Sequence, residues 1–487
     1  MLSARTRSPD LATVNSPGAA TTHSLRDPDG QLVTHGGRLF RIVAPTASAA
    51  RLDFCARPAF RAAMDRGAIV RTWAVSSADQ PAEVAAVATG SLVLEHEKLP
   101  FVSYPCEWSP LMLCDAGLHT LDMQLLALAE GLVLKDAAPT NIVFHGARPV
   151  FVDFLSFTER EQGDYLWRAR HQFDACFLLP LLLNVEVGIP IAWTLRDYLH
   201  GVSHEQARRI LGFKSWLKPG LIGAVAIPAA LSRQASGIGT THAARRRYDN
   251  DARARFVLEH QARSLHAKLS RLRSRLASGA SHWAAYTTQR GHYAEGELQV
   301  KRTFVRDALE RCTPAVVFDL GANTGEFSEL AAAKARVVAI DIDEQSVSGI
   351  IERARARKLD IHPLVGNLTF PTPAEGWKNS ETRSLLDRFS GGCDLLLVLA
   401  LMHHLRITGG IPFAEIVGLL AVVSRRHVVF ELVPPGDAMF AAMARGREPL
   451  YGDCDPARAE QALQQRFNVL RRELLPNGRV LLLLEKR

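Results

Sequence analysis

Short apolar runs alternate with amphipathic stretches along the chain from Lys301 onward. The apolar runs have the length and residue types of strands, and the stretches between them carry apolar residues at helical spacing. The predicted strands are Ala315–Leu320, Arg336–Ile340, Ile361–Val365, Asp394–Leu399, His427–Leu432, Phe467–Leu474 and Arg479–Glu485. Strands that alternate with helices favour a parallel sheet covered on both faces, and the closing pair predicts one antiparallel strand near the edge. Residues 283–487 are therefore predicted to form a doubly wound, seven-stranded α/β domain.

The N-terminal half has a less regular pattern. Residues 1–30 are rich in Ser, Thr, Pro and Asp without an apolar period, which predicts a disordered tail. The elements predicted after it are strands at Arg38–Val43, Ile69–Val75 and Gly90–Glu95, a helix over Leu111–Gly131, a strand, turn and strand over 132–157, and mostly helices over 165–235. An α+β domain is expected over 31–235.

A basic amphipathic helix is predicted between the two regions. Within 236–282, one stripe of leucines at helical spacing marks a helix that we interpret as a connector. Residues 241–276 hold ten Lys and Arg against three Asp and Glu, an excess of +7. A solvated helix face explains this charge better than a surface for nucleic acid or an anionic membrane, because no aromatic residues are interleaved in the way that single-strand binding requires.

Composition narrows the class of protein. A chain of 487 residues is too long for one hydrophobic core, and 47% hydrophobic with 22% charged residues is ordinary for a soluble globular protein. No apolar stretch follows the basic N-terminus, so no secretory signal is predicted, and the most apolar runs are too short or too interrupted to span a membrane. The seven cysteines show no zinc-ligand spacing, and they fit a reducing cytoplasm.

The segment VVFDLGANTGEFS, residues 316–328, carries the clearest chemistry. It lies where a predicted strand opens into a helix, which is where α/β sheets bind ligands. Gly321 and Gly325 allow the backbone to approach a ligand closely, and Asp319 can accept a hydrogen bond from an amine. Asp341 ends the next strand, where a carboxylate can bridge two ribose hydroxyls. Asn323 replaces the middle glycine of the dinucleotide fingerprint, and no phosphate-binding lysine follows.

These residues resemble the class I S-adenosylmethionine-dependent methyltransferases, which have a Rossmann-like fold, and the resemblance covers 283–487. It implies that Asp319 and the loop through Gly321, Asn323 and Gly325 hold the methionine part of S-adenosylmethionine. It further implies that Asp341 holds the ribose and that Ile342 packs on the adenine. Asn367 falls where the family often has an aspartate that binds the adenine amine.

The predicted fourth strand leads into Met-His-His, and its end is expected to face the methyl group. An imidazole that titrates near neutral pH can take a proton from the acceptor, which makes His403 and His404 candidate bases. The resemblance favours His404, although a structural role in capping the strand explains these residues equally well. Glu431 ends the fifth strand, and it either orients an acceptor hydroxyl or is a structural carboxylate.

Longer segments extend the resemblance over most of the chain. LALMHHL, together with SYPCEW, LKDAAPTN and PVFVDFLSF, resembles bacterial proteins related to host-specific nodulation methyltransferases. This resemblance implies a small-molecule, glycan or glycolipid acceptor, and no nucleic-acid partner is predicted.

The segment 135–153 contains a second motif. Asp136 and Asn141 have the D-x-x-x-x-N spacing of a kinase catalytic loop, and Asp153 follows a strand, turn and strand, as a magnesium-binding aspartate would. A glycine-rich loop and a strand lysine are missing, and Leu155 stands where the kinase motif has glycine. The pattern predicts a kinase-like domain with a reduced upper lobe, which would bind a magnesium nucleotide, bind substrate or only stabilise the protein.

Two functions therefore compete at the level of sequence. The first is a cytoplasmic S-adenosylmethionine-dependent methyltransferase with a kinase-like accessory domain. The second is a kinase-like phosphotransferase whose methyltransferase domain senses the cofactor. The complete glycine loop with Asp341 favours methyl transfer, and the missing kinase elements count against phosphotransfer.

Overall fold

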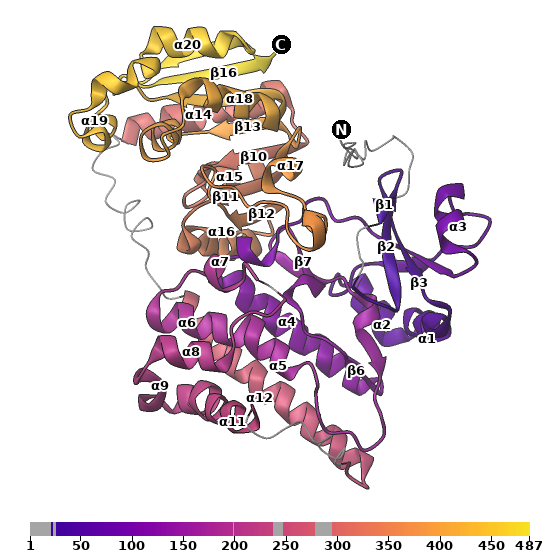
Figure 1. The fold of residues 1–487 in the computed structure, drawn as a ribbon. Coiled ribbons are helices and arrows are strands. Elements are labelled where there is room, and N and C mark those ends of the chain that lie inside the picture. Colours follow the sequence, from indigo (N-terminus) through magenta and orange to yellow (C-terminus); the bar gives the residue numbers. More distant parts are fainter. Residues whose placement is uncertain (1–20, 23–25, 198, 237–246, 278–294) are drawn as a thin grey trace, which may run out of the picture. The chain divides into compact units, whose positions relative to one another are not determined.

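A computed structural model describes residues 21–22, 26–197, 199–236, 247–277 and 295–487 (Figure 1). The chain divides into two compact units, Met1–Lys98 and Leu99–Arg487. The division falls inside the predicted 31–235 domain. The other predicted boundaries stay predictions, and most of the predicted tail lies outside the described residues.

The first unit is built on an antiparallel sheet of five strands in the order β1-β2-β3-β5-β4. The strands are β1 (Thr21–Thr22), β2 (Gly30–His35), β3 (Arg38–Val43), β4 (Thr72–Ala74) and β5 (Leu92–His96). The helices are α1 (Pro45–Ala56), α2 (Pro58–Asp65) and α3 (Ala82–Ala88). The sequence pattern missed β1, β2 and all three helices, and β1 and the start of β2 fall within the predicted tail.

The second unit begins with a mainly helical part. Its strands are β6 (Leu132–Leu134), β7 (Ile142–His145), β8 (Arg148–Phe151) and β9 (Phe157–Glu159), which form the antiparallel pairs β6-β9 and β7-β8. Its helices are α4 (Pro110–Ala129), α5 (Arg170–Phe173), α6 (Leu179–Val187), α7 (Ile191–Thr194), α8 (His204–Leu211), α9 (Lys214–Leu217), α10 (Pro219–Leu221), α11 (Ile227–Ser236) and α12 (Asp251–Ala277). The predicted helix, hairpin and helical run are confirmed.

Helices α4 and α12 pack against each other at the centre of this part. The predicted leucine stripe of α12 is buried, and Arg273 of α12 donates to Asp115 of α4 at 2.6 Å. Helix α4 has the length and apolar composition of a membrane span, but 72% of its most apolar window is buried inside the protein. These contacts are those of a core helix, and they make α12 part of the second unit.

A seven-stranded sheet follows in the order β12-β11-β10-β13-β14-β16-β15. All neighbouring pairs from β12 to β14 are parallel, and β16 is antiparallel to both β14 and β15. The strands are β10 (Val316–Leu320), β11 (Arg336–Asp341), β12 (Ile361–Val365), β13 (Cys393–Val398), β14 (Ser424–Leu432), β15 (Phe467–Leu474) and β16 (Val480–Lys486). The doubly wound sheet and its antiparallel closing strand are confirmed.

Helices cover both faces of this sheet. The helices are α14 (Glu295–Cys312), α15 (Glu326–Ala332), α16 (Glu344–Arg357), α17 (Leu385–Phe389), α18 (Phe413–Val423), α19 (Ala438–Ala444) and α20 (Pro456–Gln464). Residues of α17, α18 and α20 share a core with one face of the strands, and α14, α15 and α16 contact the strands as well. Successive strands are added toward β12 on one side of β10 and toward β14 on the other, so the carboxyl ends of β10 and β13 form the switch point at which α/β sheets bind ligands.

Candidate functional site

The loop from β10 into α15 passes close to neighbouring side chains at its two glycines. Gly321 has φ +74°, and a Cβ there would lie 3.0 Å from Leu401 Cδ1. Gly325 has φ +81°, and a Cβ there would lie 2.7 Å from Ile350 Cγ1. Both the left-handed conformation and the lack of space therefore require glycine. The backbone at the end of β10 thus packs closely against Leu401 and Ile350, and its predicted approach to a ligand stays a prediction.

Asp319 lies in β10, where the strand leads into this loop. Its side chain is buried, and Oδ2 accepts a hydrogen bond from Ser328 Oγ at 2.6 Å. Burial raises the pKa of Asp319 to about 6, opposed by the Ser328 hydrogen bond and reinforced by the charge of Asp341. A cationic ligand group beside this carboxylate would favour its ionised form.

Asp341 connects the loop to the end of β11. Its Oδ2 accepts from the backbone N–H of Asn323 at 2.7 Å, and its Oδ1 accepts from the N–H of Asp343 at 2.9 Å. Burial raises the pKa of this carboxyl group as well. The predicted ribose ligand thus also holds the glycine loop in place. Ile342, the predicted adenine contact, is 59% exposed.

Asn367 follows β12, as the sequence predicts, but its carbonyl is already engaged. Oδ1 accepts from the N–H of Thr369 at 2.9 Å and from its Oγ1 at 2.7 Å. Because both lone pairs of Oδ1 are used within the loop, binding an adenine amine there would require one of these bonds to be given up. The assignment of Asn367 to adenine stays a prediction.

His403 and His404 follow β13, and their ring centroids lie 4.3 Å apart. His403 is buried, and its Nδ1 has no hydrogen-bond partner in the described structure. Burial, reinforced by His404 and Arg479, lowers the pKa of His403 to about 3, and burial followed by Arg479 lowers the pKa of His404. The expectation of an imidazole that titrates near neutral pH is therefore wrong for His403, because a buried cation is poorly solvated beside other positive charges.

Glu431, near the end of β14, is fully buried between two cations. Its Oε1 accepts from Lys301 Nζ at 2.7 Å and from Arg479 Nη1 at 3.1 Å. These two bonds support a structural role for Oε1 of Glu431. The other oxygen, Oε2, has no hydrogen-bond partner in the described part of the chain.

The three kinase-like residues converge in the mainly helical part of the second unit. Asp136 Oδ1 accepts from Asn141 Nδ2 at 2.7 Å and also from the hydroxyl of Ser156. Burial and the charge of Asp153 raise the pKa of Asp136. Ser156 is a partner that sequence spacing did not reveal. Among the described residues, no group of three or more His, Cys, Asp and Glu could hold a metal ion.

One relative links the chain to a family. The nodulation protein NoeA of Rhizobium meliloti (strain 1021) is 30% identical over 465 residues, which cover 94% of this chain and 94% of NoeA. The chain belongs to the NoeA family. An alignment of this length includes residues of both units, and it confirms the predicted relation to nodulation proteins. No established family model matches the chain.

Solved structures similar to part of this NoeA-family chain include two methyltransferases. The N-methyltransferase NodS from Bradyrhizobium japonicum WM9, in complex with S-adenosyl-L-homocysteine, is 15% identical, with 44% of this chain and 95% of NodS covered and a TM-score of 0.31. The bifunctional kinase-methyltransferase WbdD is 20% identical, with 39% of this chain and 40% of WbdD covered and a TM-score of 0.29. Nothing about the activity of this chain follows from TM-scores this low.

The mainly helical part of this NoeA-family member is fastened to the seven-stranded domain through SYPCEW, a role that the sequence did not reveal. Glu107 forms a buried ion pair with Arg388 of α17, and Ser103 Oγ lies 3.0 Å from Nε2 of His362 in β12. A second junction lies near the glycine loop. Glu344, the first residue of α16, accepts from the N–H of Ile191 at 2.7 Å. Burial raises the pKa of Glu344 to about 7.

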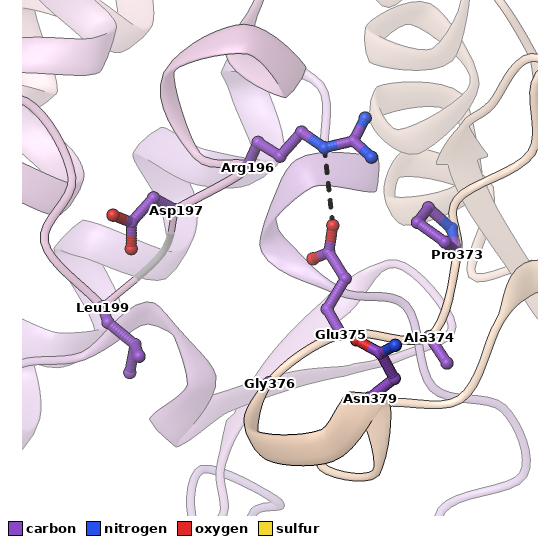
Figure 2. A pocket seen from close by; sticks show the side chains of 8 residues that line it. All are labelled: Arg196, Asp197, Leu199, Pro373, Ala374, Glu375, Gly376 and Asn379. Atoms are coloured by element: carbon purple, nitrogen blue, oxygen red, sulfur yellow. Dashed lines mark ion pairs between the residues drawn. The ribbon is translucent and has the colours of Figure 1, made fainter.

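A cleft of about 440 Å³ lies along the same junction (Figure 2). It is lined by Arg196, Asp197 and Leu199, which follow α7, and by Pro373, Ala374, Glu375, Gly376 and Asn379, which follow β12. An ion pair of 3.6 Å joins Arg196 Nε and Glu375 Oε1 across it. None of the predicted site residues is among these eight, so this cleft and the predicted site are different places.

Proposed function

We propose that this chain is an S-adenosylmethionine-dependent methyltransferase. The observation that carries the proposal is the glycine loop between Asp319 and Asp341, which lies at the switch point of a sheet with a doubly wound order. Gly321 and Gly325 hold left-handed backbone where a Cβ would crowd Leu401 and Ile350, and the two carboxylates lie at the ends of adjacent strands. These residues fit a ligand that carries both an amine and a ribose.

In this proposal S-adenosylmethionine supplies an electrophilic methyl group. Asp319 binds the amino group of the ligand, and Asp341 binds the ribose hydroxyls while it holds the loop through Asn323. Ile342 offers an exposed apolar surface to the adenine. His404 is the proposed base, and it is uncharged near neutral pH because burial and Arg479 lower its pKa. An uncharged imidazole can accept a proton, whereas an imidazolium cannot.

The acceptor class and the location are proposed from sequence. A small-molecule, glycan or glycolipid acceptor is suggested by the relation to nodulation proteins, since NoeA is named as one. A cytoplasmic location is suggested by seven scattered cysteines that show no zinc-ligand spacing.

Calorimetry with S-adenosylmethionine and S-adenosylhomocysteine on the full chain tests the cofactor assignment. Asp341→Ala is expected to weaken binding by roughly tenfold or more, because a charge-assisted hydrogen bond contributes about 1.5–3 kcal/mol. Glu310→Gln is the matched control, since this exposed carboxylate pairs with Lys334 on the surface. Equal affinity of the wild type and Asp341→Ala would refute the ribose assignment, and absence of binding by the wild type would refute the function.

Phosphotransfer is the second candidate, favoured by the contact of Asp136 with Asn141. If Asp136, Asn141 and Asp153 form a magnesium-nucleotide site, magnesium-ATP should raise the melting temperature of the full chain, because a ligand that binds only the native state stabilises it. Asp153→Asn should abolish the shift. An unchanged melting temperature at millimolar nucleotide would leave a structural or substrate-binding role for this loop.

A further inference from the structure

Five buried ionisable residues form one group beside the end of β14, which we name the Glu431 cluster. Each is at most 7% exposed, and they come from segments that are far apart in sequence. The members are Lys301 on α14, His403 after β13, Glu431 on β14, Asp437 at the start of α19 and Arg479 just before β16. A buried group of this kind is costly to assemble, because each charge loses its hydration.

The two cations of the cluster are bonded to its two carboxylates. Arg479 donates to both oxygens of Asp437, at 2.8 and 3.1 Å, and to Glu431 Oε1. Asp437 also accepts from the backbone N–H groups of Met439 and Phe440, so it is well supplied with donors. Lys301 donates to the same Oε1 of Glu431. Both cations are thus directed at one oxygen of Glu431.

Two polar atoms of the cluster have no hydrogen-bond partner among the described residues. They are Oε2 of Glu431, which is 0% exposed, and Nδ1 of His403, which is 2% exposed. Buried polar atoms in folded proteins nearly always find a partner in the protein, in water or in a ligand. The two atoms therefore indicate that a polar group from outside the described chain belongs here.

The cluster lies beside the proposed cofactor loop. β14 pairs with β13, and β13 pairs with β10, so Glu431 and His403 lie at the same edge of the sheet as Asp319. A Cβ at Gly321 would lie 3.0 Å from Leu401, which shows that the chain leaving β13 packs against the loop two residues before His403. Glu431 Oε2 and His403 Nδ1 are thus beside the position where a methyl acceptor must bind if the proposed function holds.

We infer that Glu431 Oε2 binds the methyl acceptor through a donated hydrogen bond, so that the acceptor is an alcohol or an amine and not a carboxylate or phosphate. This inference rests on the proposed function. A carboxylate oxygen attracts an O–H or N–H donor and repels an anion, and the neighbouring Lys301 and Arg479 donate to the carboxylates of the cluster. Lys301 and Arg479 are positioning residues, because they fix Oε1 and leave Oε2 for the acceptor.

The group transfer balances with the acceptor, the sulfonium and the proposed base. A lone pair on the acceptor oxygen or nitrogen forms the new bond to the methyl carbon, and the carbon–sulfur bond breaks with its electron pair moving to sulfur, which becomes a neutral thioether. The acceptor proton passes to His404, the proposed base, and from there to water, while Glu431 Oε2 orients the acceptor.

Chemical capping of the acceptor pool tests the inference directly. Labelled S-adenosylmethionine and the full wild-type chain are incubated with an extract of the cells that encode it, in three forms: untreated, acetylated to cap hydroxyls and amines, and amidated to cap carboxylates. We expect acetylation to abolish label incorporation and amidation to leave it. Incorporation that survives acetylation but not amidation overturns the inference. If the untreated extract takes up no label, methyl transfer itself is refuted, and S-adenosylhomocysteine calorimetry shows whether a cofactor site exists.

Variants separate binding of the acceptor from a structural role. Glu431→Gln should lower the rate of incorporation by roughly tenfold or more while the affinity for S-adenosylhomocysteine stays within about twofold, because the lost bond is made to the acceptor and not to the cofactor. Glu473→Gln is the matched control, since that carboxylate is paired with Arg471 on β15 at the surface. A wild-type rate in Glu431→Gln overturns the inference. If this variant does not fold, the capping experiment with the wild type decides alone.

Discussion

The loop after β10 and the loop at Asp136 both match a known motif by spacing, yet they differ in what their polar atoms do. In the first loop, two glycines hold the backbone where a side chain would clash, and Asp319 is buried with a raised pKa beside Asp341. In the second loop, Asp136 Oδ1 already accepts from Asn141 and Ser156. Both loops therefore hold an aspartate whose pKa is raised by burial, and what sets the first loop apart is its two glycines at positive φ. Motif spacing alone does not reveal the environment of either aspartate.

The largest expected effect is that of Gly325→Ala. The new Cβ would lie 2.7 Å from Ile350 Cγ1, and φ +81° is a left-handed conformation, so the free energy of unfolding should fall by about 2–4 kcal/mol. Urea unfolding measures this change, and calorimetry should show a loss of S-adenosylhomocysteine binding. Gly418→Ala is the control, because Gly418 lies within α18, has no positive φ and has open space at its Cβ position. Similar effects of both variants would show that the loop is not the constrained element described here.

The next effect concerns the buried carboxylate of Asp319. Its folded pKa of about 6 lies above the ordinary value of 3.8, so the folded protein binds this proton more tightly than the unfolded chain. The group therefore costs stability at pH values above 6, by up to about 3 kcal/mol, and this cost disappears as the pH falls below the unfolded pKa. Asp319→Asn should raise the free energy of unfolding at pH 7.5 but not at pH 4, as measured by urea unfolding at both values.

The same variant should bind the cofactor more weakly. In the wild type, affinity for S-adenosylmethionine should decline as the pH falls through about 6, because protonation removes the charge that binds the amine. Asp319→Asn should show weak binding with little dependence on pH in this range. A wild-type pH profile in the variant would assign the titration to another group.

The smallest expected effect is in the Asp136 loop. Asp136→Ala leaves Asn141 and Ser156 without this acceptor, and the free energy of unfolding should fall by about 1–3 kcal/mol. Asp136→Asn keeps an acceptor oxygen and should lose less. Neither variant should change the affinity for S-adenosylhomocysteine. A changed affinity would show that the helical part and the cofactor loop are energetically coupled, for which the contact of Glu344 with Ile191 is the available route.

Local patterns predicted most of the second unit because its strands carry nearly continuous apolar runs. Strands β12 and β15 have the predicted bounds, and the order of strands and helices in this sheet agrees with the prediction. The first unit was harder to predict from sequence. Strand β2 follows a polar segment, and its apolar and polar residues alternate only weakly. Its pairing with β3, and not its own sequence pattern, therefore defines it as a strand. The glycines and aspartate of VVFDLGANTG predicted a loop at the carboxyl end of a strand, and the structure has that loop after β10.

The sequence by itself determined the seven-stranded fold, the glycine loop and the two carboxylates, because these depend on residue type and on spacing within one segment. Only the tertiary structure decided the environment of the other candidates. It placed Lys301 and Arg479 on Glu431, it buried His403 so that its pKa falls to about 3, and it used Asn367 within its own loop. The bonds of Glu431 depend on partners that are 130 and 48 residues away, and the burial of His403 is a property of the folded neighbourhood, which no local pattern encodes.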